Sequence, residues 1–124
     1  MTGAIRLVLD TSAILAYART SIAVGETIAE VVDEGGRFAI PAVCLAEASR
    51  LADDDQTPRL LLLSQHVCAV VTTTPDDEWR VLVEWTRILG RVDLAAAMAH
   101  TTYVLTAEPK AYGDDVDQLP VIPI

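Results

Sequence analysis

The sequence predicts an α/β fold with a central, mostly parallel sheet of four or five strands and helices on both of its faces. Short apolar runs rich in β-favouring residues alternate with longer stretches at helical spacing, as expected when helices join parallel strands. Of the 124 residues, 52% are hydrophobic but only 5% are aromatic, so small and branched side chains must fill the core. A chain of this length buries about two-thirds of its unfolded surface in one core. We therefore expect a single domain over residues 1–124.

The first half of the chain is predicted to contain two strands. Ile5–Leu9 is apolar, and the Asp-Thr-Ser triplet at 10–12 caps a following helix. A helical pattern over 21–34 ends at two glycines, and a strand over 37–40 follows. Pro41 opens a helix that runs to about residue 53, since proline is tolerated in a first helical turn. Acids at 53–55 form its solvated end.

The second half repeats the alternation. Its predicted helices cover residues 57–65, 75–89 and 93–100. Residues 67–71 are predicted to form a buried strand or extended segment, residues 103–106 a strand, and residues 119–124 a final extended piece. The long helix is expected to have an acidic first turn, Asp76 to Glu78, which suits the positive end of the helix dipole. Gly90 ends it.

The charge of the chain limits the kinds of partner it can take. A formal charge of −9 argues against a nucleic-acid binder that neutralises many phosphates with a basic face. It does not argue against a nuclease, because carboxylates that hold divalent cations create a local positive platform for phosphate.

Two further features indicate a reducing compartment away from the membrane. Cys44 and Cys68 both lie in apolar surroundings, where a free thiol behaves as a small core residue. No stretch approaches the roughly 18–20 apolar residues of a membrane span, and no signal-peptide pattern opens the chain. We therefore expect a cytoplasmic protein.

Asp10 is the first candidate for chemistry. It follows the first predicted strand, and functional groups gather outside the carboxyl ends of the strands in open parallel sheets. The simpler interpretation is an N-cap, and one carboxylate can both cap a helix and bind a metal ion, since each oxygen can face a different partner.

Glu47 and Asp93 are the second and third candidates. Glu47 is the only charged residue in FAIPAVCLAEA, on a helical face shared with Val43 and Leu51 that is expected to point inward. A buried carboxylate needs a partner; a cation would serve, and the alternative is a salt bridge to Arg50. Asp93 precedes an apolar helix start, where an N-cap is the simpler role. Three acids in one α/β frame favour a hard cation such as Mg²⁺.

At this point the chain resembles the PIN-domain family of metal-dependent ribonucleases, especially its short bacterial VapC-type toxins. The matching segments are LVLDTSAILAY, IPAVCLAEASRL, VDLAAAMA and VLTAEPKAY, in the family order and over almost the whole chain. The resemblance implies a PIN-like three-layer α/β/α fold.

The resemblance also implies a site. Asp10, Glu47 and Asp93 would be its principal acids and ligands of Mg²⁺ or Mn²⁺. Glu108 stands where the family usually has a fourth acid, commonly Asp, just after a Leu-Thr pair. Ser12 would hold Asp10 and a metal-bound water, while Thr11 and Thr106 would position waters or carboxylates. The implied reaction is hydrolysis of an RNA phosphodiester.

The resemblance further implies partners. A cognate antitoxin would lay a segment across the groove and insert a basic side chain among the acids. Such domains also tend to form homodimers, for which apolar helix residues including Trp79 and Trp85 are candidates, although a core role for at least one is the simpler interpretation.

Two other functions fit parts of the sequence. One is a PIN-like domain with weakened catalysis that acts as a binding or regulatory module, which the negative charge, Glu108 and the short interval from Asp93 to Glu108 favour. The other is a receiver-like or phosphohydrolase domain with Asp10 as phosphoacceptor. It lacks the second Asp two residues on that such phosphohydrolases generally use.

Overall fold

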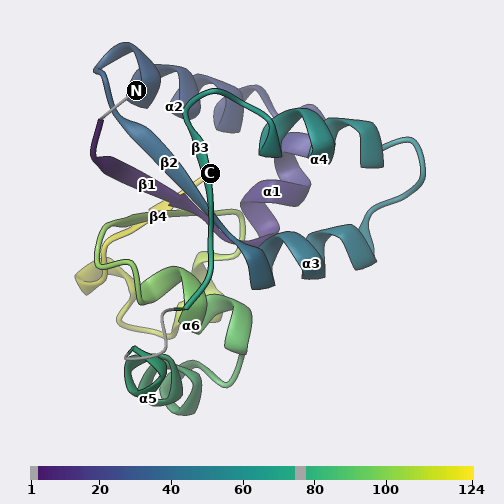
Figure 1. Cartoon of the computed structure of the whole chain (residues 1–124). Coiled ribbons are helices and arrows are strands. Elements are labelled where there is room, and N and C mark those ends of the chain that lie inside the picture. Colours follow the sequence, from purple (N-terminus) through teal and green to yellow (C-terminus); the bar gives the residue numbers. More distant parts are fainter. Residues whose placement is uncertain (1–2, 75–77) are drawn as a thin grey trace.

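The computed structural model of the chain describes residues 3–74 and 78–124. Its centre is a five-stranded sheet in which every neighbouring pair is parallel, in the order β3-β2-β1-β4-β5 (Figure 1). The strands are β1 (Ile5–Leu9), β2 (Arg37–Pro41), β3 (Ala69–Thr72), β4 (Tyr103–Thr106) and β5 (Val121–Pro123). The predicted parallel α/β fold is confirmed.

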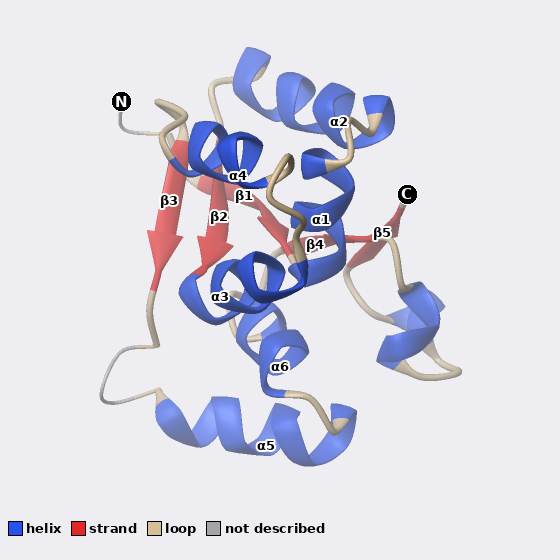
Figure 2. Ribbon diagram, turned by 90° about the vertical axis from the view of Figure 1, so that its right-hand side faces the viewer, coloured by secondary structure: helices blue, strands red, loops and turns tan. Residues whose placement is uncertain are grey.

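Six α-helices and two short 3₁₀ turns connect the strands in the part of the chain that the structure describes. They are α1 (Thr11–Ala18), α2 (Ile22–Asp33), α3 (Ala42–Leu51), α4 (Thr57–Ser64), α5 (Trp79–Leu89), α6 (Val92–Met98), η1 (Pro109–Tyr112) and η2 (Val116–Gln118). Helices α1 to α4 pack in one core against the sheet and α6 packs in the other. Figure 2 shows α6 next to α3, with α5 beyond it.

The side chains of the strands alternate between two cores, which gives the fold three layers. Leu7 and Leu9 pack with α1 to α4, whereas Val8 packs with α6 and η1. Phe38 and Ala39 of β2 divide in the same way. Since successive strand residues point to opposite faces, a sheet with apolar residues on both faces must be covered twice.

Several predicted boundaries differ from the observed ones. Pro41 ends β2 and caps α3 without a side-chain hydrogen bond, rather than opening the helix. Strand β3 lies at a sheet edge and is only half-buried. Helix α5 begins at Trp79 with Glu78 at its N-cap, so the acidic first turn is wrong at Glu78; Pro75, Asp76 and Asp77 lie outside the described residues.

The predicted core positions of the two thiols and of one tryptophan are confirmed. Cys44 and Cys68 are free and buried, as predicted. Trp85 packs against the α6 core, whereas Trp79 is 54% exposed. Within the described residues, no helix combines the length and apolar character that crossing a membrane requires.

The strand order places the functional end of the sheet. From β1 the chain moves outward to β2 and β3, then returns to the other side of β1 with β4. In open parallel sheets, ligands bind outside the carboxyl ends of the strands where the order reverses. Here that point lies between the ends of β1 and β4, next to Asp10 and Thr106.

Candidate functional site

Asp10 is fully buried at the end of β1 and caps α1. Its Oδ1 accepts hydrogen bonds from the Ala13 amide at 2.9 Å and from the Ser12 hydroxyl at 2.8 Å. Its Oδ2 accepts the Tyr112 phenol at 2.8 Å. A carboxylate oxygen has two acceptor positions, so one position on Oδ2 is unused by these bonds. The predicted N-cap is confirmed, and it leaves Asp10 able to take one further partner.

A hydroxyl network joins Asp10 to the end of β4. The Ser12 hydroxyl gives its single proton to Asp10, so the Thr106 hydroxyl must donate across the 3.1 Å that separates it from Ser12 Oγ. Ser12 Oγ also accepts the Ala107 amide at 2.8 Å, and Thr106 Oγ1 accepts the Glu108 amide at 3.0 Å. The two residues thus position Asp10 and the chain that leads to Glu108.

Asp93 meets the Asp10 segment through Thr11. The Thr11 hydroxyl donates to Asp93 Oδ2 at 2.7 Å, and both side chains are buried. Asp93 lies in the first turn of α6, which begins at Val92, so the N-cap role expected for Asp93 is wrong. Instead its carboxylate turns toward the end of β1, and the structure brings two buried acids, Asp10 and Asp93, to the switch point of the sheet.

Arg91 holds both Asp93 and Glu108. Its Nε lies 3.2 Å from Asp93 Oδ1, its Nη2 2.8 Å from Asp93 Oδ2, and its Nη1 3.0 Å from Glu108 Oε2. Burial on its own would raise the pKa of Asp93, but the hydrogen bonds from Arg91 and Thr11 outweigh it and leave the pKa below its usual value. The Asp93 carboxylate is therefore ionised and already paired with a cation of the same chain.

Glu47 does not point inward as predicted. Its side chain is 35% exposed, and its helical neighbours Val43 and Leu51 are 39% and 44% exposed. Helix α3 instead packs into the core through Cys44 and Ala48. Compared with the prediction, the helix is rotated about its axis, because these smaller side chains allow it to lie closer to α1 and the sheet. The face with Val43, Glu47 and Leu51 therefore remains at the surface.

Glu47 pairs with Arg50, the alternative that the sequence left open. The hydrogen bond from Arg50 holds the pKa of Glu47 below its usual value. Even so, Glu47 lines a cavity of about 250 Å³ together with Arg91 and Asp93. It lies at the edge of the acidic site rather than inside it.

Two buried residues were not predicted from the sequence to belong to the site. The Cys44 thiol donates to the backbone oxygen of Asp93 at 3.1 Å, and burial, with Asp10 and Asp93 nearby, raises its pKa to about 12. Burial and the Asp10 charge also raise the pKa of Tyr112. The apolar context of Cys44 predicted only burial, and Tyr112 lies 102 residues from its partner; no local pattern reveals either contact.

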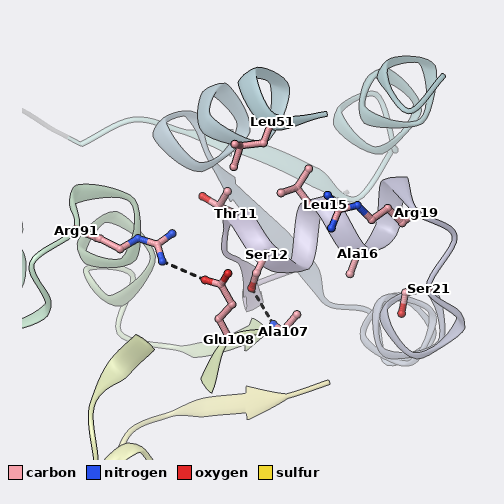
Figure 3. Close-up of a pocket in the computed structure, with 10 residues that line it drawn as sticks. All are labelled: Thr11, Ser12, Leu15, Ala16, Arg19, Ser21, Leu51, Arg91, Ala107 and Glu108. Atoms are coloured by element: carbon pink, nitrogen blue, oxygen red, sulfur yellow. Dashed lines mark hydrogen bonds and ion pairs between the residues drawn. The ribbon is translucent and has the colours of Figure 1, made fainter. Parts of the chain in front are cut away.

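A larger cavity of about 430 Å³ opens on the other side of Arg91 (Figure 3). Thr11, Ser12, Arg91 and Glu108 line one end, and Arg19 and Ser21 line the other. Arg91 is the residue that the two cavities share. Three of the predicted acids are thus divided between the two cavities. Glu108 lines the larger cavity, and Glu47 and Asp93 line the smaller one.

The ligand atoms of these residues suit a hard cation, but the present arrangement of the side chains does not. Asp10, Asp93 and Glu108 offer only oxygen atoms, the ligands that Mg²⁺ and Mn²⁺ prefer. Arg91 contacts two of these carboxylates, Asp93 and Glu108, so one guanidinium is shared between two negative charges. Yet among residues 3–74 and 78–124, no three His, Cys, Asp or Glu side chains converge closely enough to hold a metal ion. Arg91 lies between Asp93 and Glu108 and contacts both of them.

The sequence matches no family model and no curated protein. The structure, however, is similar to a chain in the crystal structure of VapBC2 from Rickettsia felis bound to a DNA fragment from their promoter. The TM-score is 0.70 at 12% sequence identity, over 96% of this chain and 98% of that chain. At this identity the likeness concerns the fold, and it confirms the VapC-type PIN-domain fold that the resemblance implied.

Proposed function

We propose that this protein is a Mg²⁺- or Mn²⁺-dependent endoribonuclease, the toxin of a type II toxin–antitoxin pair, and that it hydrolyses RNA phosphodiester bonds. The observation that carries the proposal is the pair of buried carboxylates, Asp10 and Asp93, at the switch point of a VapC-type fold. Buried acids are costly to keep in a fold, and this pair lies where open parallel sheets bind their ligands.

Each residue has a part in the proposed site. Asp10 and Asp93 hold the cation, and Glu108 and Glu47 flank it from the two cavities. When bound, the cation supplies an activated water and neutralises charge on the phosphate. Thr11 orients Asp93, while Ser12 donates to Oδ1 of Asp10 and is itself held by Thr106.

The proposed partners follow from charge and from the structural neighbour. That neighbour is a VapBC2 complex, which supports a cognate antitoxin for this chain as well. With 18 acidic and 9 basic residues, this chain suits a partner segment that brings basic side chains to the acidic site. A homodimer is proposed too, with the exposed apolar residues of α5 as its candidate face.

A catalytically weakened PIN-like module is the second candidate function. The contact of Arg91 with Asp93 and Glu108 favours it, because the guanidinium satisfies the acids without any metal ion. The two candidates make opposite predictions for one assay.

The assay is cleavage of structured and unstructured RNA by purified protein with Mn²⁺. Asp10→Asn and Asp93→Asn should each lower the rate by roughly 100-fold or more, the scale expected when a metal ligand is lost from a hydrolase. Asp53→Asn changes an exposed acid in the loop between α3 and α4; it serves as the control and should cleave like the unchanged protein. Equal cleavage by all four proteins, or none by the unchanged protein, would refute the enzyme and favour the binding module.

A further inference from the structure

We infer that Arg91 is a built-in counter-ion that competes with the divalent cation, so that the cation binds only as the guanidinium leaves Asp93 and Glu108. This inference rests on the proposed function and adds a residue of this chain that controls occupancy of the site.

Each of the three guanidinium nitrogens of Arg91 contacts a carboxylate. Nε and Nη2 form a two-point contact with Asp93, and Nη1 reaches Glu108. Because such fork-shaped, charge-assisted contacts are among the strong hydrogen bonds in proteins, Arg91 stabilises the arrangement in which no cation is bound.

Acceptor counting shows what a cation would meet. Asp93 Oδ2 accepts from both Thr11 and Arg91, which fills its two positions, and Oδ1 lies beside Arg91 Nε. A cation at Oδ1 would lie against the guanidinium, and two like charges in a partly buried site repel each other strongly. Binding of the cation and pairing of Arg91 are therefore negatively coupled.

The backbone of Arg91 lies between two helices, whereas its side chain extends toward solvent. Gly90 ends α5 with a left-handed φ of 74°, and Arg91 immediately precedes α6, so two residues join the helices. The position of the Arg91 backbone is fixed by both helices. Its side chain, by contrast, is 42% exposed, which gives the guanidinium a path to solvent.

Departure of Arg91 would also reshape the site. The cavity that contains Glu108 and the cavity that contains Glu47 and Asp93 both end at this side chain. With the guanidinium displaced, they join into one groove with the acids along it. The same movement would therefore open the cation site and the space that an RNA backbone requires.

The test is Mn²⁺ binding measured by calorimetry on the unchanged protein, Arg91→Gln and Arg87→Gln. Arg87 is exposed in the last turn of α5, so its variant matches the change in net charge without touching Asp93. We expect Arg91→Gln to bind Mn²⁺ roughly tenfold or more tightly than the unchanged protein, a coupling of ordinary size, and Arg87→Gln to differ by less than about twofold.

The outcomes separate this inference from the proposed function. Equal or weaker binding by Arg91→Gln, with Mn²⁺ bound by the unchanged protein, overturns the competition and leaves the nuclease proposal standing. No binding by any of the three proteins overturns both.

A second measurement uses only the unchanged protein, so it does not depend on whether a variant folds. In the nuclear magnetic resonance spectrum of the unchanged protein, the Arg91 Nε–Hε signal should shift on addition of Mg²⁺, while that of Arg59, which donates to the backbone oxygen of Tyr17, stays in place. A stationary Arg91 signal at saturating Mg²⁺ overturns the inference.

Discussion

The phenol of Tyr112 donates a 2.8 Å hydrogen bond to Asp10 Oδ2, across 102 residues of sequence. Asp10 ends the first strand, and Tyr112 closes the 3₁₀ turn η1 that follows Glu108. Both side chains are buried. The bond therefore ties the last quarter of the chain to the centre of the site and holds the segment that carries Glu108 against it.

Loss of this bond should destabilise the protein. Tyr112→Phe leaves Asp10 Oδ2 without its buried donor, and a buried charged acceptor without its partner costs about 1–3 kcal/mol. The free energy of unfolding in urea should fall by that amount. Tyr103→Phe is the control, because Tyr103 is 58% exposed and should change stability by less than about 0.5 kcal/mol. Equal values for the two variants would show that the Tyr112 contact contributes nothing.

Two glycines should respond oppositely to alanine. Gly25 lies inside α2 with open space around its Cβ position, so Gly25→Ala should stabilise the protein by about 0.5–1 kcal/mol. Gly90 has a φ of 74°, so Gly90→Ala should destabilise it by about 1 kcal/mol. Melting temperatures of the two variants check the contrast; changes of the same sign would contradict it.

Cys44 should be chemically silent in the folded protein. Burial, with Asp10 and Asp93 beside it, raises its pKa to about 12, so the thiol remains neutral at pH 8 and shielded from reagent. In a Cys68→Ala background, we expect alkylation of Cys44 only at the rate at which the protein unfolds. In urea the same thiol should react at once. Rapid reaction under native conditions would mean that the site is open to solvent.

The pKa of Asp93 should depend on Arg91. In the unchanged protein it lies below its usual value, so its contribution to stability is present above the unfolded pKa of about 3.9 and is lost as pH falls through the folded pKa. In Arg91→Gln, burial remains and the guanidinium is gone, so the folded pKa should rise above the unfolded one. The contribution then changes sign and stability increases as pH falls.

Carbon-detected titration of the Asp93 carboxyl checks this reversal. The midpoint should move upward in Arg91→Gln and stay in place in Arg87→Gln. An unchanged midpoint in Arg91→Gln would mean that the hydrogen bonds from Thr11 and from the Leu94 amide outweigh the burial of Asp93 without the guanidinium.

The sequence predicted the elements well where local chemistry decides them. Strand β1 and β4 have the predicted bounds, because each is a short apolar run closed by polar residues. The cap at Asp10 was equally local. Helix α3 was different: its sequence offers two apolar stripes, and only packing against α1 and the sheet selects the one with Cys44 and Ala48. Glu47 was therefore placed on the wrong face.

The locations of Asp10 and Asp93 could be predicted from the sequence, but the contacts around them could not. The positions of Asp10 and Asp93 at the switch point follow from strand ends and helix starts. Contacts between segments far apart, such as Arg91 with Glu108 and Tyr112 with Asp10, depend on the final packing of the layers. Such contacts produce no sequence pattern with the period of a helix or a strand, so only the structure reveals them.

The central claim is that Asp10 and Asp93 hold a divalent cation that Arg91 excludes in the present arrangement. A crystal grown with Mn²⁺ and examined by anomalous scattering tests this claim most directly. The account predicts an ion bound to Asp10 and Asp93, with the Arg91 guanidinium withdrawn from Asp93. Saturating Mn²⁺ with no anomalous peak at these carboxylates, and with Arg91 still paired to Asp93 and Glu108, would contradict it.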